Sequence, residues 1–146
     1  MLVKRWSWLA LLLLASIFSL PWSVAEAAEQ EPNSPVHTVY AYYGALAEGD
    51  FAAVIPLISS DSPLAPEEVA GFLQSLFAEQ EIAITDYRVK KVELSEDSPV
   101  LAEATVKLKE RVAGDKVILT ERMVLQQEEG VWKVLFAEVV KSTGSR

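Results

Sequence analysis

The sequence contains no cysteine, so disulfide bonds, thiol nucleophiles and thiolate metal sites are excluded. Its only histidine is His37, which alone cannot build the usual zinc sites of several histidine or cysteine ligands. The glycine loop that binds phosphate, the nucleophile elbow of hydrolases and the spacing of a calcium-binding loop are also absent. The sequence therefore predicts no metal site and no cofactor.

Basic residues are few. The chain has 13 Lys and Arg against 21 Asp and Glu among 146 residues, a net charge of −8. A surface with this balance repels the phosphate backbone, so nucleic acid is not an expected partner.

The first 27 residues have the organisation of a secretory signal peptide. A basic start precedes the apolar run of residues 6–20, and Ala25 and Ala27 are small residues suited to cleavage after Ala27. We predict that residues 1–27 are removed from a secreted or periplasmic protein. The alternative is an uncleaved membrane anchor, which the short run and Pro21 disfavour. Contact with a membrane is expected only in that case.

One domain is expected after the signal peptide. Residues 28–33 form a polar linker, residues 34–141 form the domain, and residues 142–146 form a flexible tail. A domain of this size has one hydrophobic core, and without disulfides its stability depends on that core.

Three helices are predicted at the start of the domain. Ser34 is a suitable N-cap before Pro35, and Gly49 ends the first helix. The second helix is short because Pro56 interrupts it, and the third begins at Pro66. The predicted apolar side of the first helix consists of Val36, Val39, Tyr40, Tyr43 and Leu46, and Tyr42 is expected at its flank. The predicted apolar side of the third helix consists of Val69, Phe72, Leu73, Leu76 and Phe77.

After Glu81 the spacing of apolar residues changes to the period of two that is typical of strands. Four strands are predicted, at residues 82–94, 100–112, 117–127 and 131–140, and the first contains a phase slip typical of a β-bulge. Short connections favour an antiparallel meander. The fold class is therefore α+β, with three N-terminal helices packed on a four-stranded antiparallel sheet.

Two tight turns set the predicted register of the last three strands. A turn at residues 114–115 places Val106 opposite Met123, and a turn at residues 129–130 places Met123 opposite Phe136. Both turns give the same apolar inner face. The predicted inner face consists of Ala104, Val106, Leu108, Leu119, Met123, Leu125, Val134, Phe136 and Val140. Trp132 belongs to the same face, near the second turn.

Two glutamates interrupt this inner face. The predicted register places Glu121 directly opposite Glu138, with Cβ atoms about 5 Å apart. Two ionised carboxylates at this distance repel in a partly dry site, which raises one pKa and suits a general acid or base. A structural alternative leaves both acids solvated at the rim or paired with Arg88, Lys90 or Lys91. A three-residue turn would instead remove Glu138 from the shared face.

The opposite face of the sheet carries apolar and basic residues together. The predicted register places Val124 opposite Leu135 and Arg122 opposite Ala137, with Lys107 and Arg122 opposed as like charges. Val124, Leu135 and Ala137 are therefore a candidate interface for a homodimer or an envelope protein. The alternative is an exposed sheet with scattered apolar residues, which is common.

Two segments resemble a known superfamily. The helical segment SPVHTVYAYYGALAEGDFAAVIPLIS resembles the start of nuclear-transport-factor-2-like domains, and EEGVWKVLFAEV resembles their last strand. The chain looks closest to the small secreted, lumazine-binding-like branch of unknown function. The resemblance implies a cone, in which a curved antiparallel sheet wraps a long N-terminal helix and leaves a cavity at the open end.

Enzymes of this superfamily, such as ketosteroid isomerases, place Asp, His or Tyr inside the cone. Their catalytic set does not map residue by residue onto this chain, and His37 is predicted at the surface because it lies beside the apolar stripe. The enzyme interpretation is proton-transfer chemistry of the isomerase or dehydratase type, with Glu121 as base and Glu138 raising its pKa.

The leading interpretation is an exported binding or interaction module without catalysis of its own. It would bury a small apolar ligand near Tyr40, Tyr43, Met123 and Phe136, or bind a partner on the outer sheet face. A third interpretation is an inhibitor-like or accessory domain of a larger envelope assembly.

Overall fold

The computed structural model describes residues 33–143, with side chains described for residues 33–136. The predicted signal peptide therefore lies outside the described residues. The elements, in chain order, are α3 (Pro35–Glu48), the 3₁₀ helix η1 (Phe51–Leu57), α4 (Pro66–Glu79), β1 (Ile82–Leu94), β2 (Leu101–Val112), β3 (Asp115–Glu128) and β4 (Val131–Thr143).

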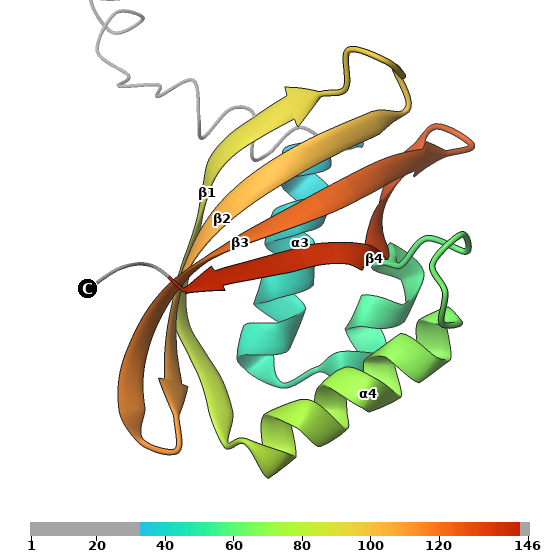
Figure 1. Cartoon of the computed structure of the whole chain (residues 1–146). Helices are drawn as coiled ribbons and strands as arrows, with labels where there is room; N and C mark the ends of the chain where they lie inside the picture. Colours follow the sequence, from blue (N-terminus) through green and yellow to red (C-terminus); the bar gives the residue numbers. More distant parts are fainter. Residues whose placement is uncertain (1–32, 144–146) are drawn as a thin grey trace, which may run out of the picture.

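The four strands form one antiparallel sheet in the order β1-β2-β3-β4. Figure 1 shows the long strands bending across α3, with α4 lying at one end of the helical layer. This arrangement confirms the predicted α+β class, with three helices packed on a curved four-stranded sheet. No helix of the described segment has the length and apolar character needed to cross a membrane.

The ends of α3 follow from local chemistry. The Ser34 side chain accepts a hydrogen bond of 3.1 Å from the His37 N–H, and Pro35 supplies a first helical residue that needs no backbone donor. Gly49 ends the helix with a φ of 71°, a left-handed conformation that glycine adopts without a Cβ clash. These boundaries confirm the prediction.

The buried side of α3 is rotated from the predicted stripe. Its buried residues include Val39, Tyr42, Tyr43 and Leu46, whereas Tyr40 is only half-buried. The prediction that Tyr42 lies at a flank is wrong, because the sheet curves around α3 and covers a wider arc of the helix than a flat sheet would. Its side chain is only 2% exposed.

The β2–β3 turn differs from the predicted one by one position. Ala113 and Gly114, with φ values of 50° and 87°, are the two turn residues, because Val112 pairs with Asp115. Positive φ at both positions matches the twist of a two-residue hairpin. Every cross-strand partner is therefore two residues away from the predicted one, and Glu121 lies opposite Val106 rather than Leu108.

The β3–β4 turn lies at residues 129–130, as predicted, but the predicted register holds only for the strand pairs nearest this turn. Val124 pairs with Leu135 as expected, whereas Arg122 pairs with Val140. Between these pairs β3 has Met123 alone and β4 has residues 136–139, so β4 contains a large bulge. Met123 and Phe136 are therefore not direct partners, and the predicted opposition of Arg122 and Ala137 is also wrong.

The inner face of the sheet nevertheless has the predicted composition wherever side chains are described. Met123 and Leu125 are fully buried, and Phe136 packs partly buried against the same core. A register change of two residues leaves each side chain on its original face, since the pleat has a period of two. Trp132 is also buried, as predicted.

Candidate functional site

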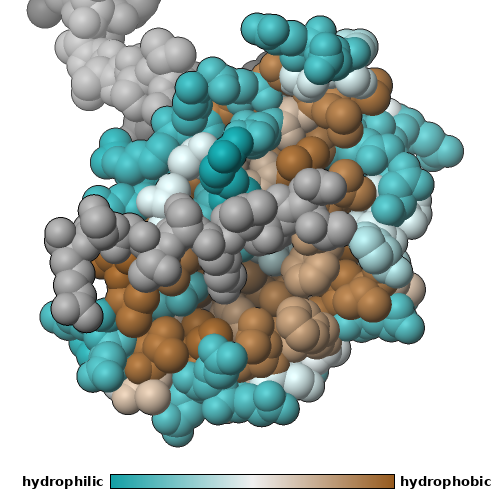
Figure 2. Space-filling model, in the orientation of Figure 1, coloured by the Kyte–Doolittle hydropathy of each residue, from teal (hydrophilic) through white to brown (hydrophobic). Residues whose placement is uncertain are grey.

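A cavity of about 450 Å³ lies between the helices and the inner face of the sheet. Its volume is in the range of small-molecule sites. Figure 2 shows hydrophobic residues gathering in the lower part of this view, above α4. The lining consists of Tyr42, Tyr43, Leu46, Phe72, Leu73, Leu76, Phe77, Gln80, Ile84, Leu108, Glu110, Glu121 and Phe136.

Aromatic rings form much of the lining. Tyr42 and Tyr43 meet edge to face with centroids 5.1 Å apart, and Phe72 meets Phe136 in the same manner at 6.1 Å. Phe72 is 49% exposed, so the prediction that it belongs to the buried stripe of α4 is wrong. The Phe72–Phe136 pair therefore lies where the cavity meets solvent.

The Tyr43 hydroxyl is the most unusual polar group of the lining. It is buried, and it interacts with the carboxylate of Glu121. Burial raises the pKa of Tyr43 well above its usual value, and the nearby Glu121 carboxylate raises it further. The two groups are thus close, and the hydroxyl stays protonated and able to donate to a ligand.

Glu121 and Glu110 bring two carboxyl groups into the same cavity. Each residue is 4% exposed, and both line the cavity. The charge of Glu110 also contributes to the raised pKa of Tyr43. Burial of carboxyl groups in a mostly apolar space is energetically costly without compensation, and it is common at functional sites.

Glu110 was missed by the sequence-based interpretation, although a signal was present. It continues the alternation of Val106 and Leu108 on β2 and therefore belongs to the inner face.

The predicted carboxylate pair of Glu121 and Glu138 is wrong. The β4 bulge places Lys141 opposite Glu121 on the neighbouring strand. Because the bulge adds an odd number of residues to β4, every later β4 residue pairs with a β3 residue of the other face from the predicted one. The side chain of Glu138 lies outside the described ones.

The other predicted ligand contacts divide into two groups. Tyr43 and Phe136 line the cavity, but neither Tyr40 nor Met123 is among its described lining residues. Met123 is a core residue. The Tyr40 hydroxyl instead accepts a 3.4 Å hydrogen bond from the Val89 N–H, so it attaches α3 to β1.

Comparison with solved structures identifies this architecture. A protein designated as a calcium/calmodulin-dependent protein kinase type II association domain, from Thiobacillus denitrificans, is 15% identical with a TM-score of 0.60, over 78% of this chain and 98% of that one. A ketosteroid isomerase-like protein from Erwinia carotovora atroseptica is 20% identical with a TM-score of 0.58, over 75% and 93%. An NTF-2 like protein of unknown function from Shewanella oneidensis is 12% identical with a TM-score of 0.55, over 68% and 90%. This chain has the nuclear-transport-factor-2-like fold.

Sequence comparison adds no closer assignment, since no family model and no curated protein match the chain. At these identities the structural likeness establishes the nuclear-transport-factor-2-like fold and not an activity. The chemistry of the cavity therefore has to be argued from its own residues.

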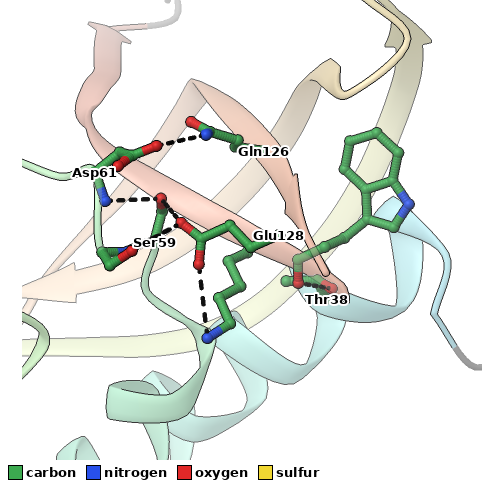
Figure 3. Close-up of polar contacts among 8 residues, drawn as sticks. Thr38, Ser59, Asp61, Gln126 and Glu128 are labelled. Carbon is green, nitrogen blue, oxygen red and sulfur yellow. Dashed lines mark hydrogen bonds and ion pairs between the residues drawn. The ribbon is translucent and has the colours of Figure 1, made fainter. Parts of the chain in front are cut away.

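A polar cluster joins the loop after η1 to the last two strands of this nuclear-transport-factor-2-like fold (Figure 3). Glu128 accepts hydrogen bonds from the Ser59 hydroxyl at 2.5 Å and from the Ser60 N–H at 3.2 Å. Its carboxylate also lies 3.8 Å from the Lys133 ammonium. The neighbouring Asp61 accepts a 2.6 Å hydrogen bond from Gln126. We call the contacts of Ser59, Ser60, Asp61, Gln126, Glu128 and Lys133 the loop latch.

The loop latch lies beside the strand that supplies the cavity rim. The Ser59 N–H donates to the Val134 carbonyl at 2.8 Å, and the Phe136 N–H donates to the Ser62 hydroxyl at 3.1 Å. The latch therefore supports the backbone that carries Phe136. The contacts join residues about seventy positions apart, and the sequence pattern did not predict them.

Two of the three residues of the predicted interface have described side chains on the outer face of the sheet. Val124 and Leu135 are paired as predicted and half-buried, while the side chain of Ala137 lies outside the described ones. The predicted opposition of Lys107 and Arg122 is wrong, because Lys107 pairs with Thr120. Arg122 instead donates from Nε to Glu103 at 3.0 Å.

No group of three or more potential metal ligands occurs among the described residues. His37 is exposed, in line with its predicted position at the surface.

Proposed function

We propose that this protein is exported and binds a small, largely apolar ligand in the cone cavity. The observation that carries the proposal is the cavity of about 450 Å³, which is lined mostly by apolar and aromatic side chains with few polar groups.

The composition of the lining indicates the kind of ligand. Leu73, Leu76, Phe77 and Ile84 offer apolar contacts, and the polar groups are few, as in typical small-molecule sites. The ligand should therefore present a hydrophobic body and one polar group directed toward Tyr43 and Glu121.

A cavity-filling substitution tests the proposal. Leu76 is half-buried in α4 and lines the cavity, so Leu76→Trp should occupy the ligand volume. With the neutral fluorescent probe N-phenyl-1-naphthylamine, we expect the wild-type chain to bind and Leu76→Trp to bind at least about tenfold more weakly. Fluorescence titration measures both affinities.

The matched control is Leu64→Trp, which adds the same side chain at an exposed position outside the cavity lining. It should bind the probe as the wild type does. Equal binding by all three proteins, or no binding by the wild type, would contradict a ligand site in the cone.

A second candidate function is proton transfer in the same cavity. It is favoured by the burial of Glu121 beside Tyr43. Glu121 would accept a proton from the carbon next to a substrate carbonyl, and Tyr43 would donate a hydrogen bond to the resulting enolate oxygen. Glu138 has no assigned part in this candidate, because the predicted pairing is wrong.

This candidate predicts exchange of α-hydrogens. In D₂O, the wild type should speed deuterium incorporation into small cyclic ketones, and Glu121→Gln should lower that rate by about 100-fold or more. NMR measures the exchange, with Glu129→Gln as an exposed control outside the cavity. Exchange that is equal with and without wild-type protein would leave ligand binding as the function.

A further inference from the structure

We propose that the half of the outer sheet face nearest the β2–β3 turn docks onto an anionic lipid surface. The proposal concerns a face on the opposite side of the sheet from the cavity and does not depend on the proposed ligand. Its residues, which we call the basic face, are Arg88, Lys107, Lys109, Arg111 and Lys116, together with Ile118.

Charge is separated between the two layers of the molecule. From Asn33 to Tyr87 the described chain contains no Lys or Arg but carries eight Asp and Glu residues. The Lys and Arg residues whose side chains are described all lie between Arg88 and Lys133, on or beside the sheet. Although the net charge of the protein is negative, one face of the sheet is therefore positively charged.

Cross-strand pairing gathers the positive charges. Arg88 lies opposite Lys107, and Arg111 lies opposite Lys116. Directly opposed residues point to the same side of a sheet, and like charges in such pairs destabilise it. Two like-charge pairs in an acidic protein cost stability, and binding an anion would offset that cost.

Several other charges of the outer face, including that of Lys109 in the basic face, have a partner of opposite sign. Asp86 is 3.5 Å from Lys109, and Glu93 is 2.8 Å from Lys91. Arg122 pairs with Glu103. By contrast, the four members of the like-charge pairs make no ion pair with a described residue.

The chemistry of the basic face favours a lipid surface over a protein partner. Protein interfaces are depleted in Lys and have an apolar centre. Among the side chains of this half that the structure describes, Ile118, at 53% exposure, is the only large exposed apolar one. Basic residues around one apolar side chain suit the headgroup layer of an anionic membrane. Two copies of this chain that met through this face would bring like charges together, which is unfavourable.

Vesicle binding tests the proposal. The chain from Ala28 to Arg146 contains every described helix and strand around one core and omits the apolar run of residues 6–20, which would insert into any vesicle. It should cosediment with phosphatidylcholine vesicles only when they contain phosphatidylglycerol, and salt should weaken the binding. The triple variant Lys107→Gln, Arg111→Gln, Lys116→Gln should bind at least about tenfold more weakly.

The matched control changes the net charge equally at exposed positions of the helical layer. The triple variant Ala52→Glu, Gln74→Glu, Ser75→Glu should bind nearly as the wild type does, since its basic face is intact. Circular dichroism checks folding, and the first variant should melt no lower than the wild type, because it removes like-charge pairs. Equal losses in both variants, equal binding to neutral vesicles, or wild-type binding to polyglutamate but not to anionic vesicles would each overturn the proposal.

Discussion

Replacing Met123 by alanine should lower the free energy of unfolding by about 2–5 kcal/mol, the usual cost of such a truncation in a core. Met123 is fully buried and lies opposite Ala104 on β2. On its other side Met123 is the single β3 residue that lies across from the bulge of β4. The small Ala104 side chain cannot fill the space that Met123 would leave. Denaturant unfolding monitored by circular dichroism measures the change.

The control for Met123 is its neighbour Val124, which faces the other side of the sheet and is half-buried. Val124→Ala should cost clearly less than Met123→Ala, and Met123→Leu should cost less than about 1.5 kcal/mol. A larger loss for Val124→Ala than for Met123→Ala would mean that the two faces of β3 are assigned the wrong way round.

Replacing Glu128 by alanine should open the loop latch and cost about 1–3 kcal/mol at neutral pH. The substitution removes the acceptor of the Ser59 hydroxyl, which belongs to a fully buried residue. It also removes the acceptor of the Ser60 N–H and the partner of Lys133. The free energy of unfolding from denaturant titration measures the loss.

The same carboxylate makes the loss depend on pH. Partial burial raises the pKa of Glu128, but the hydrogen bonds from Ser59 and Ser60 and the charge of Lys133 outweigh that effect and lower it below 4.5. A carboxylate with a lowered pKa in the folded state stabilises the fold above its unfolded pKa. The difference between wild type and Glu128→Ala should be full at pH 7 and shrink as the pH falls below 4.5 and through the lowered pKa.

Glu129→Ala is the control for both measurements. Glu129 is the next residue, is exposed and lies in the turn, so its replacement should change stability little at either pH. If the difference between wild type and Glu128→Ala were the same at pH 3 as at pH 7, the loop latch would not depend on the ionised carboxylate.

The loop latch and the cavity meet at β4. Ser62 accepts the Phe136 N–H, which is therefore taken from the ladder that a regular β4 would form with β3. Phe136 then lines the cavity and contacts Phe72. A ligand that enters between these rings would have to move a segment supported by the latch, so binding and latch stability should be coupled.

Several elements were predictable because their causes are local. The cap at Ser34, the proline after it and the left-handed Gly49 define α3 from neighbouring residues alone. The alternation in β2 and β3 predicts which side chains turn inward, since exposing that many apolar groups would be unfavourable. The sequence pattern therefore places Tyr43, Glu121 and Phe136 on the inner side.

Other features of the site had no local cause to reveal them. A turn at residues 113–114 and one at 114–115 differ by two in register, and both keep the same inner face. The sequence pattern could not separate them, so it placed Glu121 opposite Leu108, two residues away from its partner Val106. The predicted pairing with Glu138 is wrong for a different reason, because the bulge at residues 136–139 changes the register of β4.

The amino-acid order alone was sufficient for the α+β class, the helix caps and the inward side of each central strand, because each depends on neighbouring residues or on a period of two. Folding decided the β4 bulge, the burial of Tyr42, the joint placement of Glu110 and Glu121 in one cavity, and the gathering of basic residues on one outer half. These features depend on contacts between distant parts of the chain, whose geometry exists only after the helices and the sheet have packed together.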